Sequence, residues 1–233
     1  MKVMDWGRYP KVDTDFKSFS SVAKLNEIVK DSKSLIARGL GRCYGDSALN
    51  SEVIVSTEKF NRILDFNSDD GLLVCESGVS FEEILEIFVP KGWFLPVTPG
   101  TKFVTVGGAI ASDVHGKNHH IAGSISNHII SMDIMVEDGS ILTCSQYKNS
   151  ELFWATCGGM GLTGIIVKAS FKLVTIDSIY IKQDLIKAKN LDDIMDIFED
   201  SQDSTFSVAW IDCLASGDSL GRSLMMRDRK SVV

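Results

Sequence analysis

Arg38-Gly-Leu-Gly-Arg-Cys-Tyr-Gly-Asp46 follows a short apolar run, Ser34–Ala37, that is typical of a strand. Its glycines are spaced G-x-G-x-x-x-G, one residue longer than the dinucleotide fingerprint, and Ser47–Asn50 behind it gives no sign of a helix start. Glycines permit close backbone approach, and successive N–H groups in such a loop form an anion-binding nest, to which Arg38 and Arg42 would add charge. Taken alone, the segment fits an anion site and a tight surface turn equally well.

A second glycine cluster, Gly158-Gly-Met-Gly-Leu-Thr-Gly164, contains a literal G-x-G-x-x-G. A helical pattern, Glu151–Cys157, precedes it, and a strand pattern, Thr163–Val174, follows it. The Rossmann mechanism needs the opposite order, because the N-terminus of the following helix must face the phosphates. We therefore predict that the fold is not a Rossmann fold.

A third cluster lies between the other two. Pro99-Gly-Thr101 precedes Val104–Gly116, whose many small residues leave room for a large, flat ligand against the backbone. A close contact between two helices is the alternative, but it does not explain why His115-Gly-Lys-Asn-His-His120 comes next. Histidines and a lysine in a glycine-rich turn favour hydrogen bonds to a cofactor and a polar substrate. We expect no metal there, because His119 and His120 are adjacent and point apart, and no Asp or Glu stands at ligand spacing beside them.

Composition excludes several classes of protein. The formal net charge is -7, so sequence-independent binding of nucleic acid is not expected. The five cysteines form no C-x-x-C pair, which argues against zinc, and their odd number fits a reducing cytosol. The first residues form no apolar leader, and no apolar run approaches the ~20 residues that span a bilayer. We expect a cytoplasmic protein with no integral membrane segment.

The remaining patterns predict an α+β fold. Ser80-Phe-Glu-Glu83 is a capping box that opens a helix, and Asp138-Gly139 predicts the turn of a hairpin. The expected helices are Ser20–Lys30, the one after Ser80, Val104–Asp113, Glu151–Cys157 and Leu191–Glu199, and the expected strands are Ser34–Ala37, Val53–Ser56, Leu72–Glu76, Ile129–Val136, Ile141–Cys144, Thr163–Val174 and Ser207–Cys213. After Asp212 we expect no further strand, and the final segment reads as the start of a second domain.

Several of these motifs together resemble the vanillyl-alcohol-oxidase-type FAD-binding family. The matching segments are Arg38–Ala48, Pro99–Thr101, Thr105–Ala109, Asp113–His120 and Glu151–Ile165, of which the His-Gly-Lys-Asn-His-His run is the most specific. The resemblance covers nearly the whole chain, including Ala209-Trp-Ile-Asp212, and is strongest to members that act on a polyprenylphosphoryl ribose. It implies a two-lobed FAD-binding domain over residues 1–175, and the incomplete start of a substrate-binding domain over residues 176–233.

The resemblance also implies a set of site residues. The pyrophosphate of a non-covalently held FAD would lie against Ala37, Arg38, Gly39, Leu40, Gly41, Arg42, Cys43, Tyr44, Gly45, Asp46 and Ser47. The flavin and ribityl chain would lie against Gly100, Thr105, Val106, Gly107, Gly108, Ser112, Asp113, Val114 and His115, with Ile165 at the adenine end. The catalytic residues would be Tyr44, His115 and Lys117, and Lys117 and Trp210 would contact the substrate.

The implied activity is FAD-dependent oxidation of a CH–OH group, from the 2′-hydroxyl of a polyprenylphosphoryl ribose to a keto sugar. The expected partners are that polyprenyl-phosphate sugar and a nicotinamide-dependent keto-sugar reductase, with peripheral contact at the inner face of the cell membrane. Another sugar, an alditol or a lactone as substrate is the alternative, and a non-catalytic flavin-binding fragment is a third. Family members are longer than this chain by resemblance, so the catalytic base is expected beyond Val233, and Cys43 stands where relatives often have serine.

Overall fold

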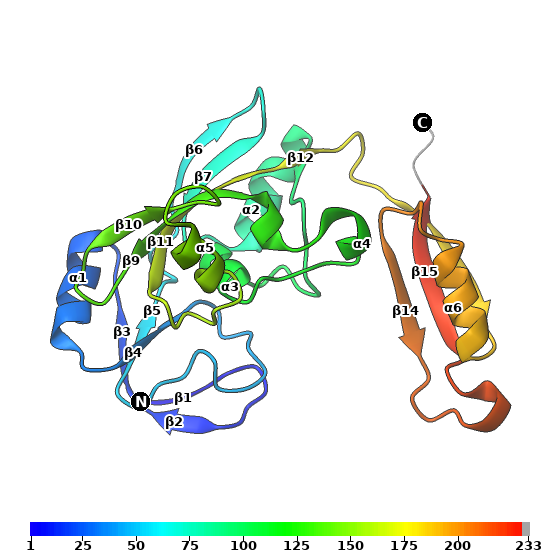
Figure 1. Cartoon of the computed structure of the whole chain (residues 1–233), viewed down its shortest axis with the longest axis horizontal. Coiled ribbons are helices and arrows are strands. Elements are labelled where there is room, and N and C mark those ends of the chain that lie inside the picture. The colour runs from blue at the N-terminus through cyan, green and yellow to red at the C-terminus, as the bar shows by residue number, and fades with distance from the viewer. Residues whose placement is uncertain (230–233) are drawn as a thin grey trace.

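The computed structural model describes residues 1–229, so the last four residues of the predicted second domain lie outside the described part of the chain. Two lobes and a smaller C-terminal unit follow one another along the sequence (Figure 1). The lobes meet around the loop after β4, and the C-terminal unit is joined to them by the segment that follows β12.

The first lobe is a small parallel sheet with one helix and an N-terminal hairpin. Its elements are β1 (Lys2–Met4), β2 (Lys11–Asp13), β3 (Asp15–Ser18), α1 (Val22–Asp31), β4 (Leu35–Arg38) and β5 (Val53–Ser56). β5 lies between β3 and β4 and is parallel to both. All four residues of β5 are buried, and the first three form an unbroken apolar run that is typical of a strand covered on both faces.

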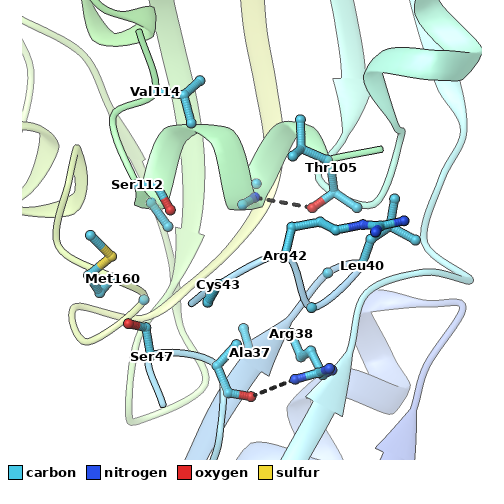
Figure 2. Close-up of a pocket in the computed structure, with 18 of the residues that line it drawn as sticks. Ala37, Arg38, Leu40, Arg42, Cys43, Ser47, Thr105, Ser112, Val114 and Met160 are labelled. Atoms are coloured by element: carbon cyan, nitrogen blue, oxygen red, sulfur yellow. Dashed lines mark hydrogen bonds between the residues drawn. The ribbon is translucent and has the colours of Figure 1, made fainter. Parts of the chain in front are cut away.

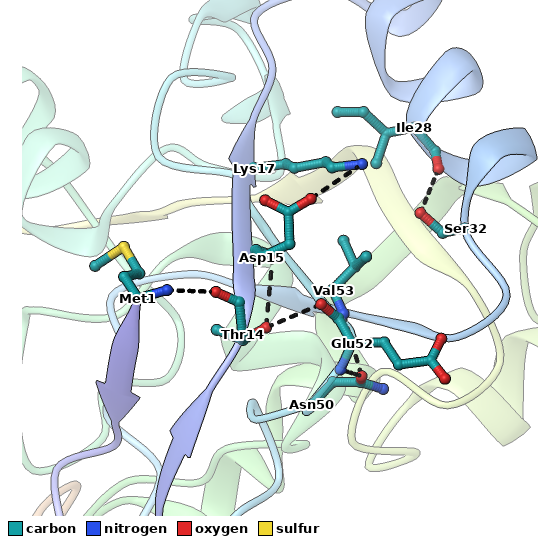
Figure 3. Close-up of polar contacts among 9 residues, drawn as sticks. All are labelled: Met1, Thr14, Asp15, Lys17, Ile28, Ser32, Asn50, Glu52 and Val53. Carbon is teal, nitrogen blue, oxygen red and sulfur yellow. Dashed lines mark hydrogen bonds and ion pairs between the residues drawn. The ribbon is translucent and has the colours of Figure 1, made fainter.

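Hydrogen bonds around Thr14 tie the N-terminal hairpin to the start of β5 (Figure 3). The α-amino group of Met1 donates to the carbonyl of Thr14 at 2.6 Å, and the Thr14 hydroxyl donates to the carbonyl of Glu52 at 3.3 Å. The same Glu52 carbonyl accepts from the N–H of Asp15, while the N–H of Glu52 donates to Asn50 Oδ1 at 2.7 Å. The hairpin is thereby held beside the end of the loop that leads from β4 to β5.

The second lobe is an antiparallel sheet covered by helices. Its sheet has the order β10-β9-β11-β7-β6 and consists of β6 (Ile63–Asn67), β7 (Leu72–Glu76), β9 (Ile129–Met135), β10 (Ile141–Cys144) and β11 (Ile165–Lys172). Around it lie α2 (Phe81–Phe88), η1 (Val89–Lys91), β8 (Trp93–Phe94), α3 (Val106–Ala111), α4 (His119–Ala122), η2 (Ile125–His128), α5 (Ser150–Thr156) and β12 (Val174–Thr175). The hairpin predicted at Asp138-Gly139 is confirmed, with Ile141 opposite Met135.

The two lobes share apolar contacts. Leu25 of α1 and Val55 of β5 pack with Met135 of β9 and Val167 of β11 in one buried cluster. The side chain of Asn26 adds a hydrogen bond across the boundary, donating to the carbonyl of Gly139 at 2.6 Å. The lobes are therefore one packed body, and the surface between them can hold a site of fixed shape.

The C-terminal unit is a three-stranded antiparallel sheet with one helix. It contains β13 (Lys182–Ala188), α6 (Leu191–Glu199), β14 (Ser207–Ile211), η3 (Gly217–Ser219) and β15 (Ser223–Arg229). The expectation of no strand after Asp212 is wrong, because β15 pairs with both β13 and β14 as the central strand. The sequence of β15 has three consecutive apolar residues followed by charged ones, so it lacks the alternation of apolar and polar residues that indicates a strand. Met225 of this strand is nevertheless fully buried, and it packs with Ile194. The predicted boundary between residues 175 and 176 falls at the end of β12 and stays a prediction.

The N-terminus of α2 tests the strongest local signal of the sequence. Ser80 Oγ accepts from the N–H of Glu83 at 3.1 Å, and the N–H of Ser80 donates to the Glu83 carboxylate at 2.7 Å, so the predicted capping box is confirmed.

Ser80→Ala should lower the free energy of unfolding by about 1 kcal/mol, because the first turn of α2 loses its side-chain acceptor. Urea denaturation measures the change. Ser51→Ala is the matched control, since Ser51 is exposed and makes no side-chain hydrogen bond in the described structure; equal effects of the two changes would contradict the assignment.

Candidate functional site

A cavity of about 700 Å³ lies between the two lobes. The loop after β4 forms one wall, and α3 forms the other (Figure 2). Figure 2 shows Thr105 and Ser112 on the α3 side and Met160 at one end. The predicted site residues in the lining are Ala37, Arg38, Gly39, Leu40, Gly41, Arg42, Cys43, Tyr44, Gly45, Ser47, Gly100, Thr105, Gly107, Gly108, Ser112 and Val114.

Glycines allow close contacts at two places in the lining of this cavity, one within the second lobe and one between the lobes. The N–H of Gly107 donates to the carbonyl of Ser77 at 2.8 Å, and a Cβ added to Gly107 would lie 2.9 Å from the Ser77 side chain. A Cβ added to Gly39 would overlap the side chain of Thr105, the residue that caps α3. Only glycine allows this approach at either position. The small residues seen in the sequence therefore bring the β4 loop, the end of β7 and α3 together.

Arg38 uses its charge inside the protein. Its guanidinium forms an ion pair with Asp5, whose side chain is fully buried, and donates to the carbonyls of Met4 and Ala48 at 2.9 and 3.3 Å. Sequence reasoning expected this arginine to add charge to an anion site, whereas its guanidinium anchors the loop to the N-terminal hairpin. Breaking a buried pair of this kind typically costs 3–5 kcal/mol, because a charge is left without a partner.

Arg42 differs from Arg38 in its surroundings. Its Nε–H donates to the carbonyl of Phe103 at 3.1 Å, and its guanidinium lies over the rings of Trp6 and Phe103, 4.8 and 5.3 Å from their centres. It has no carboxylate partner among the described residues. Arg42 is therefore the lining cation whose charge is available to an anionic ligand.

The lining fits an extended cofactor that carries phosphates. Gly45 and Gly100 border open space, because a Cβ built on either would meet no atom within 4 Å. The hydroxyl of Ser77 is buried beside the cavity and has no hydrogen-bond partner in the described structure. A cavity of this volume lies in the usual range for cofactor sites, and the loop supplies backbone N–H groups of the kind that bind phosphate.

Five predicted cofactor residues lie outside this lining: Asp46, Val106, Asp113, Ile165 and His115, the last of which lines a separate cavity. Val106 and Ile165 are buried in the apolar core, and Asp46 is exposed. Asp113 accepts hydrogen bonds from the Ser124 hydroxyl at 2.9 Å and the Ser126 N–H at 3.1 Å, so its carboxylate holds the turn before β9. Next to Ile165, however, Ile166 does line the cavity.

A second cavity, of about 520 Å³, adjoins the first and shares Pro99 and Gly100 with it. Its walls come from the turn around His115 and Lys117 on one side, and from the end of α6 and the start of β14 on the other. Of the three predicted catalytic residues, His115 and Lys117 thus lie in the second cavity, while Tyr44 is exposed at the first. Trp210 is exposed on β14 and lines neither, although its neighbour Ala209 lines the second.

Sequence reasoning missed part of the first cavity. The lining also includes Trp6, Ala48, Thr57, Ser77, Pro99, Thr101, Val104, Ala111, Thr156, Met160, Gly161, Gly164 and Ile166. A signal existed for Met160 and Gly161, because they belong to the glycine cluster that failed as a Rossmann motif, and the N–H of Met160 donates to the carbonyl of Ala111 at 2.8 Å. Trp6 gave no signal, since only the folded hairpin brings it to the loop.

Thiols and metal ligands define no separate site here. Burial raises the pKa of the Cys43 thiol in the first cavity, with a further contribution from the Asp5 carboxylate, and burial raises the pKa of Cys157 to about 12. Residues 1–229 contain no cluster of three His, Cys, Asp or Glu side chains that could hold a metal ion. Within the same residues, no helix has the length and apolar character needed to cross a membrane.

The fold and the first cavity define a flavin-binding class of protein, and comparison with known families agrees. The FAD binding domain family matches residues 17–145, more than half of the chain. The chain therefore belongs to the FAD binding domain family, and its cofactor is FAD. The resemblance and the α+β fold class predicted from the sequence are confirmed.

Three curated relatives illustrate the similarity. Decaprenylphosphoryl-beta-D-ribose oxidase of Mycolicibacterium smegmatis is 36% identical over 97% of this chain and 51% of its own length. D-arabinono-1,4-lactone oxidase of Yarrowia lipolytica is 27% identical over 74% of this chain and 34% of its own, and D-lactate dehydrogenase of Archaeoglobus fulgidus is 29% identical over 58% and 32%. The chain thus spans about half, or less, of the length of these relatives.

Two glycines of the β4 loop offer a matched test of the first cavity. Gly39→Ala should destabilise the protein even without FAD, by roughly 1–3 kcal/mol, because its Cβ would overlap Thr105. Gly45→Ala should leave the stability of the apoprotein nearly unchanged but weaken FAD binding, because its Cβ points into open space and that space is the ligand's. Thermal unfolding of apoprotein and titration with FAD measure the two effects. Wild-type FAD affinity in Gly45→Ala would argue that the cofactor does not approach this part of the loop.

Proposed function

We propose that the first cavity holds FAD non-covalently and that the protein is an FAD-dependent oxidoreductase acting on CH–OH groups. The residues from Ala37 to Ser47 would surround the pyrophosphate, and Gly100, α3 and Ser112 would lie along the flavin and its ribityl chain. The relatives support this assignment, because the names of three of them describe oxidases or dehydrogenases of sugars, lactones or hydroxy acids. The volume, the open glycines and the unpaired charge of Arg42 are consistent with it.

The substrate that we propose is a polyprenylphosphoryl ribose, oxidised at the 2′-hydroxyl to the keto sugar. The observation that carries this proposal is the 36% identity to decaprenylphosphoryl-beta-D-ribose oxidase over 97% of the chain, with the second cavity directly beside the first. A sugar that enters the second cavity would reach the shared Pro99-Gly100 wall, next to the proposed flavin position.

The protein's own contribution to the reaction is positioning and proton management. When bound, FAD would supply the acceptor for the hydride that leaves the sugar carbon, and the proton of the oxidised hydroxyl would pass to a basic side chain or to water. His115 and Lys117 would contact the substrate in the second cavity, with His115 at the hydroxyl groups of the sugar, and Tyr44 would border the first cavity at its exposed side. Fixing the reacting carbon beside the acceptor accounts for much of the rate gain in such reactions.

The proposed product requires a partner. A 2-keto sugar becomes the epimeric alcohol only when a second enzyme delivers hydride to the opposite face, so we propose a nicotinamide-dependent keto-sugar reductase as the consumer of the product. A polyprenyl substrate also requires contact with a bilayer surface, and we place that contact at the inner face of the cell membrane.

Two other functions are alternatives to this proposal. The similarity to D-arabinono-1,4-lactone oxidase favours a lactone, another sugar or an alditol as substrate, because the glycine-rich loops would serve those reactions equally well. A flavin-binding chain without catalytic activity is the third candidate.

Anaerobic reduction of the bound flavin separates these candidates. We expect the yellow holoprotein to lose its visible flavin absorbance when mixed with farnesylphosphoryl ribose, and to keep it with the 2′-deoxy analogue, which lacks the hydroxyl that is oxidised. Simple alditols and a pentonolactone serve as competing substrates in the same assay. Faster reduction by a lactone or an alditol would favour the second candidate, and a flavin that no substrate reduces would favour the third.

His115 provides the second test of this function. Because it lines the second cavity and not the first, His115→Ala should keep its flavin but reduce it about 100-fold more slowly, as expected when a hydrogen-bonding or proton-transferring group is lost. Flavin content is measured by absorbance after desalting, and reduction by stopped-flow mixing. Unchanged flavin content together with an unchanged reduction rate would remove His115 from the reaction.

A further inference from the structure

We propose that the second cavity contains a phosphate-binding subsite, formed by Lys117, His119 and His120, which recognises the phosphate ester of the substrate separately from its sugar. The subsite rests on the proposed function, which places a phosphorylated sugar in this cavity. It adds His119 and His120 to the site residues predicted from the sequence.

The lining of the second cavity carries a positive charge, at Lys117, and no negative one. Its lining contains Lys117 and three histidines and no aspartate or glutamate, although the chain has 31 acidic residues against 24 lysines and arginines. Asp200 and Asp203 flank the lining residues Ser201 and Gln202 in sequence but are not part of the lining. A concave surface with one sign of charge raises the local concentration of ligands of the opposite sign.

The side chains of Lys117 and the three histidines keep hydrogen-bonding groups that no other part of the described protein occupies. The Lys117 ammonium has no ion pair or side-chain hydrogen bond among residues 1–229, and neither His115 nor His119 makes a side-chain hydrogen bond there. His120 uses one ring nitrogen, because Nε2–H donates to the carbonyl of Ser204 at 2.9 Å, and this leaves Nδ1. Ammonium and imidazole N–H groups are suitable donors for the strong, charge-assisted hydrogen bonds that phosphate oxygens accept.

The turn that carries these side chains is fixed from both sides. Asn118 is buried and its amide donates to the carbonyl of Pro96 at 2.9 Å, which ties the turn to the segment that leads into the Pro99-Gly100 wall. The carbonyl of Lys117 accepts from the N–H of Ser207 at 2.9 Å, which ties the turn to β14. The ring centroids of His115 and His119 lie 5.6 Å apart, and those of His119 and His120 lie 5.9 Å apart. The cluster is thus gathered before any ligand binds, which lowers the entropy cost of binding.

If Lys117, His119 and His120 had only a structural role, their removal would have a different effect on ligand binding. If the cluster serves only to dock the C-terminal unit, as the bond from His120 to Ser204 would allow, its removal should loosen that unit and weaken every ligand of the cavity alike. If the cluster binds phosphate, only phosphorylated ligands should lose affinity. The two roles therefore separate when a ligand is compared with its phosphate-free counterpart.

Calorimetric titration of the flavin-loaded protein with farnesyl phosphate and with farnesol tests the subsite. We expect farnesyl phosphate to bind more tightly, and Lys117→Met to weaken farnesyl phosphate about tenfold while farnesol affinity stays unchanged. His119→Gln should weaken farnesyl phosphate in the same selective way. Lys148→Met is the control, because Lys148 is an exposed lysine outside both cavities and has no ion pair in the described structure.

Several outcomes would overturn the subsite. They are equal affinity of the wild type for both ligands, no measurable binding of farnesyl phosphate, equal losses for both ligands in Lys117→Met, or the same loss in Lys148→Met. Failure of the proposed function is seen elsewhere, as flavin that farnesylphosphoryl ribose does not reduce. Phosphate-selective binding without flavin reduction would keep the subsite and reject the substrate, and reduction without phosphate selectivity would do the reverse.

Discussion

The close approach of the β4 loop to the start of α3, where the two lobes meet, is the constraint on which the rest of the structure depends. Gly39 of the first lobe lies against the side chain of Thr105, and within the second lobe Gly107 lies against Ser77, so the β4 loop, the end of β7 and α3 meet around one cavity. A cofactor wall made from backbone offers N–H groups and carbonyls at fixed positions, which a wall of side chains would cover. The apolar cluster shared by α1, β5, β9 and β11 holds the lobes in the positions that this contact requires.

Local signals in the sequence predicted much of the fold. The capping box at Ser80, the turn at Asp138-Gly139 and the buried run Val53–Ser56 each depend on residues within a few positions of one another, and the structure confirms all three. β15 was missed because its burial depends on α6, which covers Met225 from more than twenty residues away in sequence. Packing between segments that are distant in sequence produces no regular hydrophobic pattern within the strand itself, so the strand cannot be recognised from its own residues.

The same distinction applies to the site. Glycines in the sequence indicate both the loop 38–47 and the helix after Thr105 as candidate site segments. The structure places both segments in the lining of one cavity. The glycine cluster at Gly158–Gly164 was correctly rejected as a Rossmann motif, yet it reaches the same cavity for a different reason. The chain reverses there from α5 to β11, with Gly161 and Gly164 at φ of 80° and 144°. Positive φ explains those glycines, and the cavity contact is a consequence of where the reversal occurs. The ion pair of Arg38 with Asp5 could not be predicted, because the two residues are far apart in sequence and no local pattern around either one indicates its partner.

The three basic side chains nearest the cavities show how an acidic chain can still bind anions. Arg38 is neutralised by Asp5 and holds the loop in place, so its charge contributes little to a ligand. Arg42 rests on Trp6 and Phe103, which orient its guanidinium without neutralising it. Lys117 lies in a cavity whose lining has no carboxylate. The net charge of -7 therefore says little about either site, because solvent screens charges beyond about 8–10 Å and the nearest groups determine what binds. Recognition of an anion here depends on which cations are left without an internal partner, and the hydrogen bonds and ion pairs of the fold decide that.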